Sequence, residues 1–285
     1  MNDMSPSRWE VAEVAPNIGC SIRTDKQTLL SGAKAKEIRA LMESRGVIVF
    51  PQINLTDAEQ IAFTHTLGTF AHEVGEQANN KSGMDSVYPI TMDPKVNPNA
   101  SYLRGAFFWH IDGTMSDMPI LASIMSARSL AKAGGETDFC NTYAAFDALP
   151  EDEKAMIEKL QVVHAMWRSQ LYHDPEPDYA SMKLWQSIGR NTLPLVWKHR
   201  TGRKSLVLGA TALQVEGMDM FESELLLVRL REWATSPQFS YRHTWSLGDM
   251  VIWDNTGTMH RATHYDYDSG RLMHRTKLEG EEAFA

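Results

Sequence analysis

The chain has 285 residues, 43% of them hydrophobic and 22% charged, which is the composition of an ordinary globular protein with a sizeable core. A net charge of −8 offers no basic surface to nucleic acid, and no run approaches the ~20 apolar residues that span a bilayer. Two cysteines without a spacing pattern and the lack of a signal peptide favour a cytoplasmic protein, which we expect to be a homo-oligomer.

The elements expected before residue 72 alternate between strand and helix. Residues 9–22 alternate weakly in polarity, which indicates one or two short edge strands. A helix is expected over 33–44, followed by a buried strand at 47–50. The capping box that begins at Thr56 then opens a second helix, which ends at Leu67.

The rest of the chain is predicted to consist mainly of short strands. Two helices are expected here, one that begins at Leu149 and one over 222–233. We expect strands at 119–127, 137–141, 161–167, 195–199, 205–208, 239–245, 250–253 and 272–278. Many short strands with a few flanking helices indicate a mostly β fold, a barrel or sandwich, in one domain over residues 1–285.

Two segments, residues 72–106 and 170–191, are polar and lack periodicity, and we interpret them as insertions. A long irregular segment in a compact domain is either disordered or functional. Because the first segment leads directly to His110, we favour a lid for it.

A His-x-Asp pair at His110 and Asp112 is the candidate centre of the site. In an extended segment, residues two apart point to the same face, so the imidazole and the carboxylate can converge. His260, beyond the strand that ends in Trp253, would complete a set of two histidines and one carboxylate. Such a set is typical of non-haem Fe(II) sites with open positions, although a lone His-x-Asp pair is usually a surface feature.

Arg271 and Arg275 lie four residues apart on a predicted strand and therefore face the same side. Two guanidinium groups on one face are suited to holding a dicarboxylate. Without further context, two solvated surface arginines are the alternative. Thr137, after the Gly134-Gly135 turn, offers a hydroxyl donor or is a plain strand threonine.

In this order, the motifs around His110, Thr137, His260, Arg271 and Arg275 resemble the family of taurine dioxygenase and 2,4-dichlorophenoxyacetate dioxygenase. The resemblance runs from about residue 47 to the end of the sequence. It implies a double-stranded β-helix (jelly-roll) core and a dependence on Fe(II), 2-oxoglutarate and O2.

The resemblance also implies roles for single residues. His110, Asp112 and His260 would bind iron. Arg271 would hold the distal carboxylate of 2-oxoglutarate with support from Thr137. Further residues are expected at the co-substrate or substrate: Arg275 beside the co-substrate and open to an anionic substrate, His72 as the family's substrate-binding histidine, and the lid aromatics Tyr102, Phe107 and Phe108.

The expected reaction is hydroxylation of an sp3 C–H of a small carboxylate or sulfonate, aryl- or alkyl-substituted, coupled to decarboxylation of 2-oxoglutarate to succinate and CO2. Where the hydroxylated carbon bears an ether oxygen or a sulfonate, the product collapses, with net cleavage. Two alternatives stay open: a hydrolase with zinc on the same three residues, and a non-catalytic jelly-roll binding protein.

Overall fold

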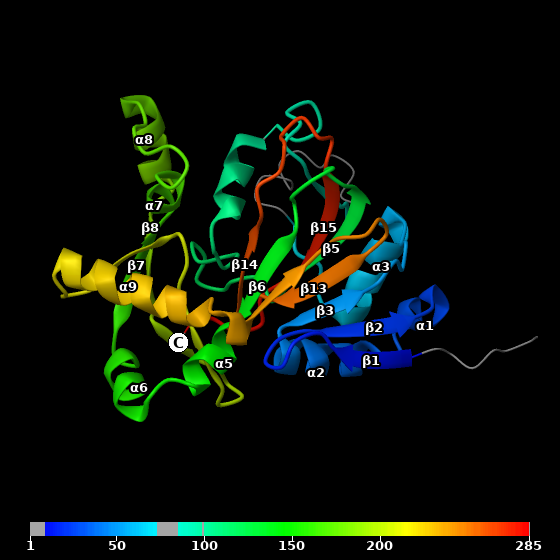
Figure 1. Cartoon of the computed structure of the whole chain (residues 1–285), viewed down its shortest axis with the longest axis horizontal. Coiled ribbons are helices and arrows are strands. Elements are labelled where there is room, and N and C mark those ends of the chain that lie inside the picture. Colours follow the sequence, from blue (N-terminus) through cyan, green and yellow to red (C-terminus); the bar gives the residue numbers. More distant parts are fainter. Residues whose placement is uncertain (1–8, 73–84, 99, 285) are drawn as a thin grey trace, which may run out of the picture.

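A computed structural model describes residues 9–72, 85–98 and 100–284 of the chain (Figure 1). Its main sheet has seven strands, in the order β1 (Trp9–Glu13), β2 (Cys20–Thr24), β3 (Val47–Phe50), β13 (Met250–Asp254), β5 (Ala122–Ser129), β15 (Leu272–Leu278) and β4 (Tyr88–Ile90). A second sheet has the order β12 (Ser240–His243), β6 (Thr137–Asn141) and β14 (Thr258–Ala262). The predicted jelly-roll class is confirmed by solved structures described below.

The two sheets enclose an apolar layer that includes Val49, Phe139, Trp253 and Met273. Strand β3 is buried on both faces, because Ile48 and Phe50 point the other way, into the core beneath the helices. Three helices cover that outer face (Figure 1): α1 (Lys26–Leu30), α2 (Ala35–Arg45) and α3 (Asp57–Leu67). The mouth between the sheets is thereby left to the loops.

A third layer lies on the far side of the sheet formed by β12, β6 and β14 and has its own hydrophobic core. It contains the sheet β11 (Ala212–Val215), β7 (Gln161–Ala165) and β8 (Arg190–Pro194), and the pair β10 (Lys204–Leu206) and β9 (Val196–Lys198). Its helices are α5 (Thr142–Asp147), α6 (Glu151–Ile157), α7 (Met166–Gln170), α8 (Tyr179–Ser187) and α9 (Met220–Ala234). Two 3-10 helices, η1 (Ala100–Phe107) and η2 (Pro237–Phe239), complete the elements.

Local sequence signals account for several of these boundaries. Helix α3 begins with the predicted capping box: the Thr56 hydroxyl accepts from the backbone N–H of Glu59, and the Glu59 carboxylate accepts from that of Thr56. Helix α2 ends at Gly46, whose φ of 73° is left-handed and favours glycine. The predicted helices at 33–44 and 222–233 are present within one or two residues of those bounds.

The predictions were wrong in the second insertion and at two strand ends. Residues 170–191 are not irregular, because they contain α8, capped by Asp178. Helix α8 has no buried residue, although Tyr179, Met182 and Trp185 recur every three residues along it. The strand predicted at 161–167 ends at Ala165, and α7 begins at Met166. His260 follows the predicted strand β13 but lies inside β14, a strand that was not predicted, rather than in a loop.

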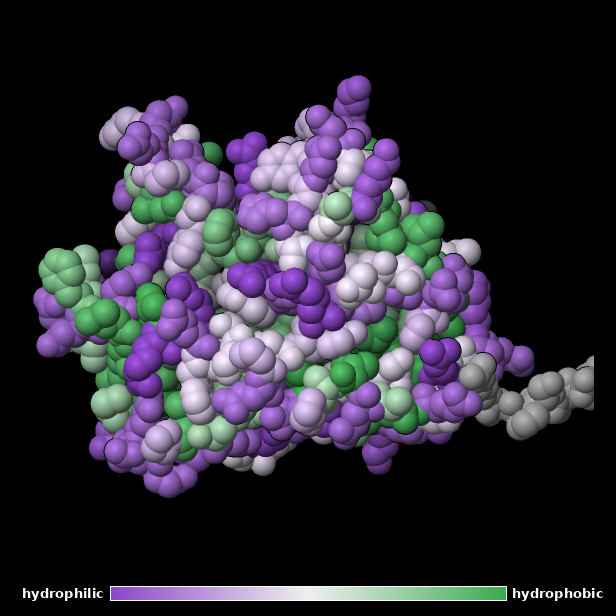
Figure 2. All heavy atoms as spheres, in the orientation of Figure 1, coloured by the Kyte–Doolittle hydropathy of each residue, from purple (hydrophilic) through white to green (hydrophobic). Residues whose placement is uncertain are grey.

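The first insertion, residues 72–106, is partly ordered into β4 and η1, while residues 73–84 and 99 of that prediction lie outside the described residues. No helix of the described part combines the length and the apolar character needed to cross a bilayer. On the surface, Figure 2 shows apolar side chains over the outer end of α9. Phe221 there is 80% exposed and Leu225 73%.

Candidate active site

His110 and His260 lie opposite each other on two backbone segments. An isolated antiparallel bridge joins them: the His110 N–H donates to the His260 carbonyl at 3.0 Å, and the His260 N–H donates back at 2.9 Å. On its other edge β14 pairs with β6, which places His260 across from Phe139. The two imidazole rings are 4.1 Å apart between centroids, so backbone pairing alone brings both histidines to one point.

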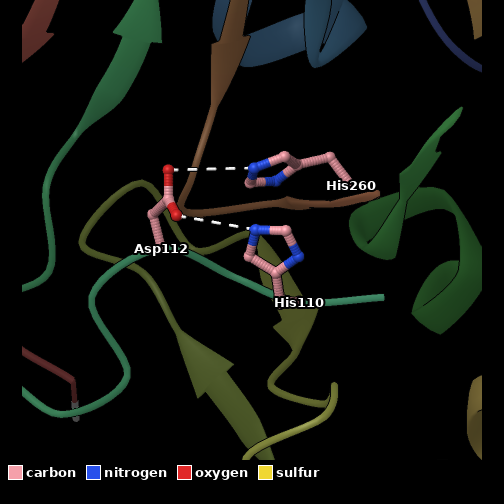
Figure 3. A group of neighbouring side chains, drawn as sticks. All are labelled: His110, Asp112 and His260. Atoms are coloured by element: carbon pink, nitrogen blue, oxygen red, sulfur yellow. Dashed lines mark ion pairs between the residues drawn. The ribbon is translucent and has the colours of Figure 1, made fainter. Parts of the chain in front are cut away.

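Asp112, two residues beyond His110, turns its carboxylate toward both rings (Figure 3). Its Oδ1 is 3.7 Å from His110 Nε2, and its Oδ2 is 3.8 Å from His260 Nε2. These separations are too long for hydrogen bonds, yet all three ligand atoms lie within 4.8 Å of one another. Two ligand atoms that are each about 2.1 Å from one ion can be at most about 4.2 Å apart. The Asp112–His110 and Asp112–His260 distances both meet this limit, so each pair fits a shared metal.

The protonation states suit a divalent cation. The Phe108 carbonyl can only accept, so His110 Nδ1 donates to it at 2.8 Å and Nε2 presents a lone pair. Burial lowers the pKa of His260 to about 3, which keeps that imidazole neutral. Burial alone would raise the pKa of Asp112, but the nearby positive charges, Arg275 among them, and a hydrogen bond from Ser123 hold it below its ordinary value. A neutral His260 imidazole and an ionised Asp112 carboxylate are the forms that bind a divalent cation.

A chain of buried hydrogen bonds orients Asp112. Ser123 Oγ donates to Asp112 Oδ2 at 3.0 Å, Asn255 Nδ2 donates to Ser123 Oγ at 3.1 Å, and Trp253 Nε1 donates to Asn255 Oδ1 at 3.0 Å. Ser123 was not predicted as a site residue, because it lies in an ordinary strand pattern. The Trp253-Asp254-Asn255 motif was a visible signal for this chain, because its indole and amide are two of the links.

Arg271 lies just before β15 and is 3% exposed. Its NH2 donates to the Gly135 carbonyl at 3.0 Å, and its guanidinium carbon is 4.8 Å from the centroid of the Tyr265 ring. Arg271 Nε is buried without a hydrogen-bond partner in the part of the chain that the structure describes. Burial lowers the pKa of Arg271, but a guanidinium remains charged at any physiological pH. A buried cation with unused donors is suited to a carboxylate.

The other two residues predicted for the co-substrate are also close to this region. Arg275, on β15, places NH1 3.7 Å from Asp112 Oδ2 and lies 5.6 Å from the Tyr88 ring. Thr137, at the start of β6, is 2% exposed, and its hydroxyl oxygen accepts from Trp245 Nε1 at 3.0 Å. That bond leaves the hydroxyl proton of Thr137 available as a donor.

The residues predicted for the substrate are spread more widely. Phe108 is the closest to the three ligands, since its carbonyl holds His110 and its ring lies 5.0 Å from that of Tyr172. The His72 ring pairs with Asp85 at 3.3 Å. Tyr102 is 52% exposed and donates to Met166 Sδ at 3.6 Å. These contacts tie the lid residues to one another and to α7.

Known proteins were compared with the chain. The (S)-phenoxypropionate/alpha-ketoglutarate-dioxygenase of Sphingobium herbicidovorans is 33% identical over 98% of both chains. The alpha-ketoglutarate-dependent 2,4-dichlorophenoxyacetate dioxygenase of Cupriavidus pinatubonensis is 32% identical over 88% of this chain and 90% of its own.

Solved structures agree with these relatives. The structure of AAD-2 with Mn(II) and N-oxalylglycine superimposes with a TM-score of 0.79 at 28% identity, covering 97% of this chain and 99% of that one. A putative alpha-ketoglutarate-dependent taurine dioxygenase from Burkholderia xenovorans gives a TM-score of 0.77 at 27% identity, covering 96% and 94%. The profile of the taurine catabolism dioxygenase TauD, TfdA family matches residues 10–277, so the chain belongs to the TauD/TfdA family of dioxygenases.

Proposed function

We propose that the chain is an Fe(II)- and 2-oxoglutarate-dependent dioxygenase that hydroxylates an sp3 C–H of a small organic acid. The observation that carries the proposal is the convergence of His110, Asp112 and His260 near the guanidinium of Arg275, with the buried cation of Arg271 just before the strand that bears Arg275. Bound iron supplies the oxidation, in which 2-oxoglutarate is decarboxylated to succinate and CO2 while O2 provides the hydroxyl oxygen.

The side chains of the site would bind the metal ion and 2-oxoglutarate and orient them. His110, Asp112 and His260 would hold the ion, which would offer its remaining coordination positions to the keto-acid and O2. Arg271, with the Thr137 hydroxyl as a second donor, holds the distal carboxylate and so fixes the direction of the chelating end. Arg275 supplies a positive charge beside the ligands.

The substrate that we propose is a carboxylate or sulfonate with an aryl or alkyl body. Relatives named for 2,4-dichlorophenoxyacetate, (S)-phenoxypropionate and sulfate esters support an anionic substrate. In this chain Arg275 offers the charge, and the ring of Phe108, which lies two residues before His110 and packs against Tyr172, offers an apolar surface. If the carbon that is hydroxylated carries an ether oxygen, the product breaks down with cleavage of the ether.

The zinc hydrolase is the alternative in a different class. A hydrolase would use the same three ligands to activate water, but it has no need of a buried arginine with an unused Nε. The non-catalytic binding protein would not need the three ligands at all. Arg271 therefore favours the oxygenase.

The decisive experiment is an anaerobic titration of 2-oxoglutarate into the Fe(II)-loaded protein, followed by visible absorption. A weak charge-transfer band should appear, and protein that binds metal without developing the band would contradict the oxygenase. A panel of phenoxy acids, alkyl carboxylates, sulfonates and sulfate esters, screened for succinate release after air is admitted, then identifies the substrate class.

We further propose that the protein forms a homo-oligomer in the cytoplasm. The exposed apolar end of α9, where Phe221 and Leu225 are one helical turn apart, supports the self-association. Light scattering of the wild type and of Leu225→Asp measures it, and a monomeric wild type would contradict it.

A further inference from the structure

Tyr265 and the Gly134-Gly135 turn enclose Arg271 from two sides. An isolated β-bridge pairs Gly134 with Tyr265, which brings the loop after β14 onto the turn before β6. A Cβ on Gly135 would lie 2.8 Å from Arg271 Nε, and one on Gly134 would lie 1.9 Å from the His264 carbonyl oxygen. Both glycines therefore permit a close approach that any other residue would prevent. The guanidinium sits between the Gly135 carbonyl and the Tyr265 ring.

The same loop receives the last residue of η1. The Phe107 ring stacks on His264 at 4.4 Å and contacts Tyr265 at 5.6 Å and Tyr267 at 6.0 Å between centroids. Phe107 is 6% exposed, so its ring is enclosed by these contacts. The next residue in the chain, Phe108, holds His110 through its carbonyl.

We propose that Tyr265 is a positioning residue for Arg271, and that Phe107 of η1 holds Tyr265 in place. This inference rests on the proposed function and extends it. Helix η1, Arg271 and the metal ligand His110 then form one packed unit. The distal carboxylate of 2-oxoglutarate meets a guanidinium that is already aligned.

The physical basis is the attraction between a desolvated guanidinium and the face of an aromatic ring. A free guanidinium would have to give up rotamers before it could bind a carboxylate in a fixed geometry, and a ring that restrains it in advance removes that cost from binding. A desolvated contact of this kind is worth about tenfold in affinity. The Tyr265 hydroxyl also interacts with the Arg271 guanidinium, so the ring and the hydroxyl both contribute to the restraint.

The test is calorimetric titration of 2-oxoglutarate into Mn(II)-loaded protein, which measures binding without turnover. Tyr265→Leu should raise the dissociation constant of 2-oxoglutarate about tenfold. Tyr265→Phe keeps the ring but loses the hydroxyl that also interacts with Arg271, so its dissociation constant should lie between those of wild type and Tyr265→Leu. Phe107→Leu should move the constant in the same direction as Tyr265→Leu, by less.

Two controls separate positioning from a general loosening of the loop. Oxalate chelates the metal but has no distal carboxylate, so its affinity should be unchanged in Tyr265→Leu. Tyr267→Leu alters the same aromatic cluster, and the Tyr267 ring is 6.4 Å from the Tyr265 ring, farther than Phe107 is. Tyr267 itself lies against Arg104 instead of Arg271, so Tyr267→Leu should weaken 2-oxoglutarate binding less than Phe107→Leu does. Thermal unfolding of each ligand-free variant reports folding.

Equal affinity for 2-oxoglutarate in wild type and folded Tyr265→Leu would overturn the inference, as would equal losses for oxalate and 2-oxoglutarate. If Tyr265→Leu does not fold, Phe107→Leu against Tyr267→Leu decides, and equal constants for those two would overturn it. A wild type that binds Mn(II) and oxalate but not 2-oxoglutarate would instead contradict the proposed function. The two failures are therefore distinguishable.

Discussion

Replacing Ser123 with alanine should weaken metal binding without touching a metal ligand. Ser123 is fully buried and donates to Asp112 Oδ2 at 3.0 Å, so water cannot replace the lost hydroxyl. Arg275 NH1 lies only 3.7 Å from the same oxygen. Without Ser123, the carboxylate is free to turn toward that guanidinium and away from His260. Loss of such a supporting hydrogen bond costs about 10- to 100-fold in metal affinity.

The assay is the Mn(II) dissociation constant of Ser123→Ala, measured by competition with a chelator. The matched control is Ser126→Ala, on the same strand β5 but on its other face, where Ser126 Oγ donates to Gln60 Oε1 at 2.5 Å. Both variants should unfold at a lower temperature, since each leaves a buried polar partner unpaired. Only Ser123→Ala should lose metal affinity. An unchanged Mn(II) constant in that variant would refute the reasoning.

Three further predictions concern the co-substrate, pH and a glycine. Arg271→Ala should keep Mn(II) affinity and lose most affinity for 2-oxoglutarate in calorimetry, and retained affinity would contradict its role. Burial raises the pKa of Asp254 to about 6. The contribution of Asp254 to the free energy of unfolding is therefore fully present below about pH 4 and is lost as the pH rises through about 6. Asp254→Asn keeps the oxygen that accepts from Thr256 but cannot ionise. In urea unfolding, its free energy of unfolding relative to wild type should rise by about 2 kcal/mol between pH 4.5 and 7.5. A difference that stays constant over this pH range would contradict the raised pKa of Asp254. Gly134→Ala should lower the unfolding temperature more than Gly202→Ala, because both have positive φ but only Gly134 meets an atom within 2 Å.

Much of the site was accessible from short motifs. His110 and Asp112 converge because an extended segment puts alternate residues on one face. Arg271 and Arg275 do point inward together, although Arg271 precedes β15 and the register shifts between Leu272 and Met273. The family, the fold and the reaction class of the relatives are confirmed by the comparisons, while the residue roles stay predictions.

The parts that could not be predicted depend on tertiary contacts. Helix α8 is an exception, because Asp178 caps it and Tyr179, Met182 and Trp185 recur every three residues, so its sequence did carry a helix signal. Ser123 is one of three serines in β5, and only the pairing of β5 with β13 sets it beside Asn255. The aromatic cluster around Phe107 joins segments that are far apart in the chain. No local sequence pattern indicates such long-range contacts.

The backbone bridge between His110 and His260 links the metal site to the folding of the entire domain. The two residues are 150 positions apart in the sequence, so their pairing closes a very long loop. Locally unfolded segments cannot retain this site, because β14 must already be paired with β6. Metal binding therefore stabilises the folded chain globally, by an amount that grows with the logarithm of metal concentration. The amide protons of His110 and His260 should then exchange with solvent only through global unfolding, and more slowly as metal is added.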